Sequence, residues 1–293
     1  SKNTLTRIIY AAVSSSTFGR APVFSIPFLL AGFSAFEVLS YRWGVASIVL
    51  IVFGWLSGCN FRLAVKDWGV VFLLSLLRAV TSFSLIIAYQ NIASGVASTI
   101  HFMYPLAVAL AMMFFFREKK SLLVILAVLM SLLGAALLSL GELEAKSGNT
   151  MVGLVAACVS VFSYAGYIVG VRTTRAVQIN STALTCYVMG LGTIFYLIGA
   201  YCTSGLQLVS DGYTWLIILG LALPATAISN ITLVQAIKYA GPTLTSILGA
   251  MEPLTAVVIG VFVFKELFTV NSAVGIILIL LAVSIVVFRR QKS

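Results

Sequence analysis

Four charged side chains lie inside segments that are otherwise apolar: Arg20, Arg42, Arg78 and Glu252. A charge at the centre of a hydrocarbon layer costs about 3 kcal/mol or more, so such a group normally faces a partner or a ligand. A guanidinium binds carboxylate or phosphate through paired hydrogen bonds. We therefore expect Arg20 and Arg78 to bind a negatively charged group of a small molecule. In the alternative interpretation they pair with Glu252 or with backbone carbonyls and only hold helices together.

Glu252 precedes Pro253, which leaves a helix carbonyl without its usual donor and favours a bend there. Its carboxylate could bind an ammonium group, carry a coupling proton, or neutralise an arginine. His101 lies one helical turn before Tyr104 and is the only histidine of the chain. A histidine at membrane depth can relay protons, or it can be a hydrogen-bonded packing residue.

Further polar and aromatic residues in apolar segments are candidates for contact with a small molecule. They are Asn230, Gln235, Tyr89, Tyr164, Tyr167 and Trp43. For each of them, helix packing or anchoring at the membrane interface is the alternative interpretation. Arg42 lies nearer the end of its segment, five residues after Glu37, which favours a structural or snorkelling role.

The elements that must position these residues follow from composition. Of 293 residues, 61% are hydrophobic and only 9% are charged, whereas soluble domains are about 45–50% apolar and about 25% charged. A spanning helix needs roughly 20 apolar residues, so we expect an all-α integral membrane protein with ten transmembrane helices. The expected spans are residues 5–30, 34–57, 68–90, 94–116, 121–140, 150–171, 181–203, 213–238, 243–264 and 270–288.

The basic residues predict the orientation. If the N-terminus is cytoplasmic, the outer loops contain only Lys146 and Lys265, and the cytoplasmic side contains most of the 18 Lys and Arg. The cytoplasmic residues are Lys2, Arg7, Arg62, Lys66, Arg117, Lys119, Lys120, Arg172, Arg175, Lys238, Arg289, Arg290 and Lys292. Both termini are therefore expected inside. The formal net charge of +10 then reports topology and gives no support to nucleic-acid binding.

The second half of the chain repeats the first with an offset of 148 residues. Met103-Tyr104-Pro105-Leu106 falls on Met251-Glu252-Pro253-Leu254, and a Phe-x-Phe-(Arg/Lys)-Glu motif follows at the same spacing in both halves. With this offset Arg78 corresponds to Thr226, Ser82 to Asn230, His101 to Gly249 and Tyr104 to Glu252. Five helices per half is an odd number, so residues 1–141 and 142–293 are predicted to be five-helix repeats of inverted topology.

The sequence contains few features that would indicate an enzyme. One histidine excludes a His-rich metal site, the four cysteines lack metal or disulfide spacing, and no GxxxxGK[ST] motif is present. We expect no catalytic residue, no metal and no cofactor. The expected partners are a small-molecule substrate and the lipid bilayer, with coupling to protons left open together with the oligomeric state.

The repeated motifs, "YPLAVALAMMFFFREKKS" and "MEPLTAVVIGVFVFKELFT", resemble those of the drug/metabolite transporter superfamily, and more narrowly of its EamA-type exporters. The resemblance covers essentially the whole chain. It implies a secondary transporter that exports amino acids or related small metabolites across the bacterial inner membrane by alternating access. Arg20 and Arg78 depart from a simple neutral-amino-acid site. The alternatives are an exchanger or importer of anionic or zwitterionic metabolites, such as phosphorylated compounds, carboxylates or nucleoside-type cofactors, and an integral-membrane enzyme or structural subunit.

Overall fold

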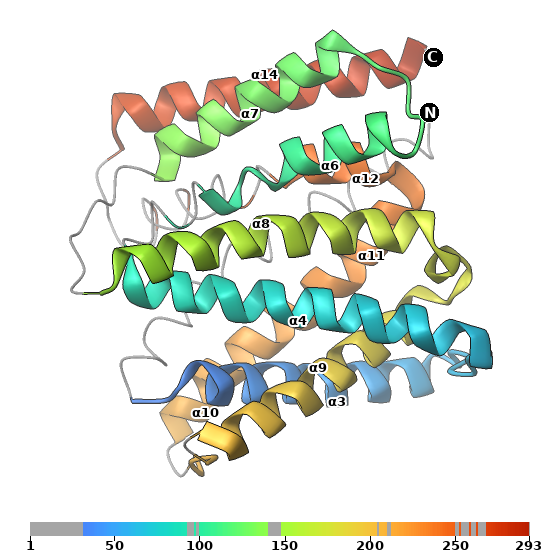
Figure 1. The fold of residues 1–293 in the computed structure, drawn as a ribbon, viewed down its shortest axis with the longest axis vertical. Helices are drawn as coiled ribbons and strands as arrows, with labels where there is room; N and C mark the ends of the chain where they lie inside the picture. Colours follow the sequence, from blue (N-terminus) through green and yellow to red (C-terminus); the bar gives the residue numbers. More distant parts are fainter. Residues whose placement is uncertain are drawn as a thin grey trace.

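The computed structural model describes residues 32–92, 97, 100–139, 148–203, 205–209, 212–249, 252, 258, 262 and 268–292. Within these residues the chain is helical and contains no β-strand (Figure 1). The expected first span, residues 5–30, lies outside the described residues, and Arg20 lies outside them as well.

The described residues form a bundle in which α3, α4, α7, α8, α9 and α14 are long and the other helices are shorter (Figure 1). The α-helices are α3 (Ala35–Leu56), α4 (Trp68–Asn91), α6 (Tyr104–Phe114), α7 (Leu122–Ser139), α8 (Thr150–Thr173), α9 (Ser181–Thr203), α10 (Gly212–Ala222), α11 (Ser229–Ala240), α12 (Pro242–Leu248) and α14 (Val270–Lys292). Two short 3-10 helices, η1 (Val65–Asp67) and η3 (Arg175–Gln178), and a π-helix, η4 (Leu223–Ile228), complete the set.

In the described part of the chain, four helical stretches are long and apolar enough to cross a membrane. They are Ala35–Leu56, Val65–Asn91, Thr150–Thr173 and Ser181–Thr203. These stretches agree with four of the expected spans to within three residues.

Side-chain caps explain where two of these helices begin. The Ser34 hydroxyl accepts a hydrogen bond of 3.3 Å from the Glu37 amide at the start of α3. The Asn149 side chain accepts from the amides of Met151 and Val152, at 3.1 and 3.3 Å, at the start of α8. Such caps satisfy amides that lack an intrahelical partner, so short polar residues mark the helix starts.

Two expected helices differ from the structure, and a proline is the reason in each case. The helix expected over residues 94–116 is interrupted by a turn at Phe102 and Met103, and α6 begins only at Tyr104. Pro105 has no amide to donate, so it is accommodated in the first turn of a new helix. The helix expected over residues 213–238 contains the π-helix η4, which includes Pro224. A π-segment accommodates a proline by shifting the hydrogen-bond register.

Helices at repeat-equivalent places lie side by side and run antiparallel. Phe36, near the start of α3, packs on Gly199, near the end of α9, whereas Trp43 further along α3 packs on Gly192, earlier in α9. Because the partner's number falls as the residue number rises, α3 and α9 are antiparallel. Figure 1 shows the pair at one edge of the molecule, with α7 and α14 paired at the opposite edge.

The helices α6 and α12 come from different halves of the chain and also run antiparallel. Tyr104, in the first turn of α6, contacts Gly249 at the end of α12. Glu118, which follows α6, accepts a 2.7 Å hydrogen bond from the hydroxyl of Thr243 in the first turn of α12. The Glu of the repeated motif in the first half therefore connects the end of α6 to the start of a helix in the second half.

Contacts at the helix ends join α4 to α8. Arg175 forms a 2.7 Å ion pair with Asp67 at one end of the two helices. At the other end the Asn149 amide donates to the Asn91 side chain at 3.1 Å. The helices are thus antiparallel along their whole length, as Figure 1 shows at the centre of the molecule.

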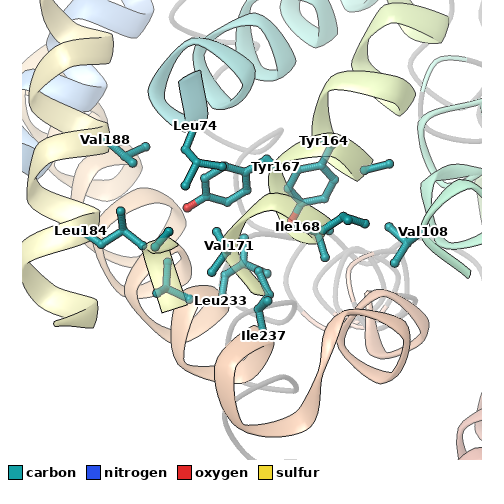
Figure 2. Close-up of a cluster of buried hydrophobic side chains, with 14 of the residues drawn as sticks. Leu74, Val108, Tyr164, Tyr167, Ile168, Val171, Leu184, Val188, Leu233 and Ile237 are labelled. Atoms are coloured by element: carbon teal, nitrogen blue, oxygen red, sulfur yellow. The ribbon is translucent and has the colours of Figure 1, made fainter. Parts of the chain in front are cut away.

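A cluster of buried apolar side chains lies where α4, α6, α8, α9 and α11 converge (Figure 2). Tyr164 and Tyr167 of α8 project into it among aliphatic side chains. The labelled members are Leu74, Val108, Tyr164, Tyr167, Ile168, Val171, Leu184, Val188, Leu233 and Ile237. Most of these residues lie between the middle of their helices and the end that carries the Arg175–Asp67 ion pair, so the buried core is apolar on that side.

Candidate functional site

Arg78 lies near the middle of α4 and is only 1% exposed. Its Nε atom donates to Oδ1 of Asn230 at 3.0 Å, and an Nη atom donates to the Ser82 hydroxyl at 2.9 Å. Ser82 is one turn further along the same helix, and Asn230 comes from α11 of the other half of the chain. The guanidinium is therefore held in a fixed direction by one group from each repeat.

The amide of Asn230 is itself oriented by η4. Its Nδ2 atom donates to the backbone carbonyl of Thr226 at 2.7 Å, which leaves Oδ1 for Arg78. The Thr226 hydroxyl accepts a hydrogen bond from Nε of Arg42. Thr226, in η4, and Asn230, in the first turn of α11, are both buried and therefore connect two buried guanidinium groups.

Aromatic rings surround the Arg78 guanidinium. Its Cζ atom lies 5.3 Å from the ring centroid of Tyr164 on α8 and 5.8 Å from that of Trp43 on α3. Tyr164 packs edge-on against Tyr104 of α6, with ring centroids 4.6 Å apart. Contacts of this kind stabilise a desolvated cation, so the two rings are suited to a buried guanidinium.

Glu252 lies 5% exposed at the other side of Tyr104 and is hydrogen-bonded to its hydroxyl. A Cβ atom on Gly249 would overlap that hydroxyl, so only glycine allows this approach. Arg78 acts on Glu252 through its electric field. The three interpretations of Glu252, as a partner of an ammonium group, a carrier of a coupling proton or a partner of an arginine, all stay predictions.

His101 joins the same aromatic group. Its ring stacks on Tyr164 with centroids 5.5 Å apart, and its Nδ1 atom lies 3.0 Å from the Ser160 hydroxyl. The side chain is 2% exposed. Arg78 of α4, Tyr104 of α6, Tyr164 of α8 and Asn230 of α11 are therefore brought together with His101, which precedes the turn before α6.

Two predicted residues lie further from this centre. Gln235 is half-buried on α11, more than one turn beyond Asn230. Tyr89 is half-buried toward the end of α4, where it packs with Ala88 and Ile92 and acts electrostatically on Arg42.

The sequence interpretation did not single out Ser160, and it named Thr226 only as the repeat equivalent of Arg78. For Arg42 it favoured a structural or snorkelling role. Arg42 is 5% exposed and hydrogen-bonded, so it does not snorkel toward the membrane surface. The one signal that could have identified Thr226 is the repeat, because Thr226 is the equivalent of Arg78. No signal in the sequence points to Ser160, since serines are common in helices of this kind.

Comparison with known proteins gives a family and a fold. The model of the EamA-like transporter family matches the chain twice, over residues 5–140 and 151–288. A solved structure, described only as a crystal structure of a protein, is similar with a TM-score of 0.81 and 18% sequence identity. The match covers 100% of this chain and 99% of that chain. No curated protein matches the chain.

Proposed function

Because the chain belongs to the EamA-like transporter family, whose members are integral membrane proteins, we propose that it exports amino acids or related small metabolites by secondary active transport. One observation carries the proposal. The Arg78 guanidinium is buried, fixed by Asn230 and Ser82, and surrounded by aromatic faces from α3 and α8. A fixed, desolvated cation of this kind is suited to the carboxylate of a small molecule.

Alternating access between two inverted halves is the proposed mechanism. The antiparallel packing of α3 on α9 supports it, because inverted repeats place equivalent helices in opposite directions. The polar site lies between the halves, where Arg78 meets Asn230 and Tyr104 meets Glu252. Rocking of one half against the other would expose these residues first to one side of the membrane and then to the other.

The charged residues take different parts in the proposed cycle. Arg78 binds the substrate carboxylate, with Arg20 proposed as a second contact for negative charge. Glu252 binds the substrate ammonium or carries the coupling proton. Asn230 orients Arg78, Tyr164 and Tyr104 form the wall, and His101, Gln235 and Tyr89 extend the site.

Counterflow in proteoliposomes tests the function. Purified protein is reconstituted with an unlabelled amino acid inside, and entry of the same labelled amino acid is measured across a panel that includes organic anions. The proposal expects exchange of at least one amino acid that disappears in Arg78→Gln. If reconstituted, folded protein exchanges nothing in the panel, the proposal is wrong.

Glu252→Gln separates the two roles of Glu252. The glutamine keeps an oxygen for the Tyr104 hydroxyl but loses the negative charge. If Glu252 carries the coupling proton, this variant should still catalyse counterflow but no longer respond to a pH gradient. If it binds ammonium, counterflow itself should weaken.

A second candidate is an exchanger or importer of anionic metabolites. It is favoured by the two buried arginines, Arg42 and Arg78, which are linked through Thr226 and Asn230 next to the single described buried carboxyl of the site, Glu252. Counterflow of phosphate esters or dicarboxylates without any amino-acid exchange would establish this alternative.

The proposed location is the bacterial inner membrane with both termini in the cytoplasm. The basic residues Arg172 and Lys238 lie together, since Arg172 donates at 2.7 Å to the Lys238 carbonyl, and the Arg175–Asp67 ion pair marks the same helix ends. Labelling of single cysteines with an impermeant reagent in intact cells tests this orientation. A cysteine replacing Lys66 should be protected, and one replacing Lys146 should be labelled.

A further inference from the structure

His101 is the one histidine of the whole chain, and its two ring nitrogens have different surroundings. Nδ1 lies 3.0 Å from the Ser160 hydroxyl. Nε2 is buried and has no hydrogen-bond partner among the described residues. Buried polar atoms are nearly always paired, so an exception at a candidate binding site points to a ligand atom.

The neighbourhood of Ser160 decides which nitrogen carries the proton. The Ser160 hydroxyl lies 2.6 Å from the carbonyl of Ala157, and a carbonyl can only accept. Since the serine has one hydroxyl hydrogen, that hydrogen goes to Ala157, and the serine oxygen must accept from His101. The proton of a neutral His101 is therefore on Nδ1, and Nε2 is an acceptor.

Burial and charge both favour the neutral ring. His101 is 2% exposed, so a charge on its ring would be buried away from water. An imidazolium here would be a second desolvated cation near the Arg78 guanidinium.

The His101 ring, with its unpaired Nε2 atom, and the Arg78 guanidinium contact the same aromatic side chain. Tyr164 contacts both groups: the His101 ring at 5.5 Å and the Arg78 Cζ atom at 5.3 Å from its centroid. Trp43, which contacts Arg78 from α3, has an Nε1–H donor that is buried and has no partner within the described residues. Around the Tyr164 ring, Arg78 and Trp43 thus provide hydrogen-bond donors, and Nε2 of His101 provides an acceptor.

We propose that His101 is a specificity-determining residue that accepts a hydrogen bond, through Nε2, from an N–H or O–H group beside the substrate's anionic group. This inference rests on the proposed transport function and narrows its substrate class. α-Amino and α-hydroxy acids have both groups that the site requires: a carboxylate for Arg78 and an N–H or O–H donor for Nε2 of His101. Anions that only accept hydrogen bonds leave Nε2 desolvated and unpaired, which is the situation that gives enzymes their strongest rejection of an analogue.

The tautomer can be measured without knowing the substrate. Protein labelled with ¹⁵N-histidine contains one imidazole, so its ¹⁵N spectrum reports a single ring. We expect a protonated Nδ1 and an unprotonated Nε2, and we expect Ser160→Ala to give a mixture of tautomers. A proton on Nε2 in the unaltered protein would overturn the inference.

Matched acids then test the recognition. Binding to the purified protein is compared for L-phenylalanine, L-phenyllactate and 3-phenylpropionate, and for L-leucine, its α-hydroxy acid and 4-methylpentanoate. Within each set only the α-substituent changes. We expect the amino or hydroxy acid to bind at least about tenfold more tightly than the acid without a donor, and His101→Phe to bring that ratio near one.

The outcomes separate this inference from the proposed function. If the acids bind but the donor makes no difference, or if the ratio survives in His101→Phe, the inference is wrong and the transport proposal stands. If none of the six acids binds, the proposed amino-acid class is wrong and the inference fails with it. If His101→Phe does not fold, Ser160→Ala replaces it, because that variant keeps the ring and should lower the ratio by freeing the tautomer.

Discussion

The two halves of the chain contribute different chemistry to equivalent positions of the site. The first half supplies Arg78, His101 and Tyr104, while the second supplies Thr226, Gly249 and Glu252 at the same repeat positions. Equivalent residues also meet or come close. Tyr104 is hydrogen-bonded to Glu252, and Gly249 gives it room.

The difference shows how a repeated fold acquires a polar centre. In two identical halves an arginine would replace Thr226, and it would face Arg42. In this chain the second half offers Asn230 and Thr226 instead, which accept hydrogen bonds from Arg78 and Arg42. Divergence between the halves has therefore made the interface complementary and left an excess of positive charge in it.

Removing the charge that the first half contributes should have the largest effect. Arg78→Gln eliminates charge-assisted hydrogen bonds to a substrate carboxylate, each of which is worth about 1.5–3 kcal/mol. We expect substrate affinity to fall at least about tenfold to a hundredfold, measured by binding to the purified variant. Arg78→Lys should not restore it, because an ammonium lacks the planar fork. Unchanged affinity in a folded Arg78→Gln protein would exclude Arg78 from the binding site.

Adding a charge to the second half should have the next largest effect. Asn230→Asp keeps the shape but places a carboxylate 3.0 Å from Nε of Arg78. The new ion pair should compete with an anionic substrate and lower its affinity about tenfold. The variant also loses the hydrogen bond from Nδ2 to the Thr226 carbonyl, so substrate affinity in folded protein is the measurement. Asn91→Asp makes the same chemical change at the end of α4 and serves as the control. If both variants bind equally well, Arg78 does not bind the anionic group.

Filling the space that Gly249 leaves should cost stability. A methyl group there would overlap the Tyr104 hydroxyl, and overpacking of this kind costs about 1–3 kcal/mol. We expect a lower melting temperature for Gly249→Ala, and partial recovery when Tyr104→Phe is added. Gly69→Ala is the control, since nothing lies within 4 Å of its added methyl. Equal melting temperatures for the two alanine variants would contradict the close contact.

The smallest effect is expected where the halves touch outside the site. Thr243→Val removes the 2.7 Å hydrogen bond to the half-buried Glu118 carboxylate, which joins α12 to the end of α6. We expect a loss of about 1–2 kcal/mol in unfolding free energy, with substrate affinity retained. In Thr203→Val the lost hydroxyl bonds only carbonyls of its own helix, so that variant should lose less. A larger loss in the control would show that the Glu118 contact is not stabilising.

Much of the helical framework could be predicted from apolar length alone. The spans expected at 68–90 and 181–203 match α4 and α9 closely, because a bilayer imposes about 20 apolar residues on any spanning helix. The departures occur at Pro105 and Pro224, where a missing amide interrupts the hydrogen-bond ladder. A proline in a sequence predicts such a break. Whether the chain then forms a turn or a π-helix depends on the helices that pack around it.

The sequence by itself determined the class of the protein, the repeat and the list of costly buried charges, since these depend on residue type and spacing along one chain. Only the tertiary structure decided that Arg42 is buried. It also decided the partners, because it pairs Arg78 with Asn230 and Glu252 with Tyr104. These pairings join residues about 150 positions apart, and helix packing, which depends on side-chain shape across the whole interface, brings them together.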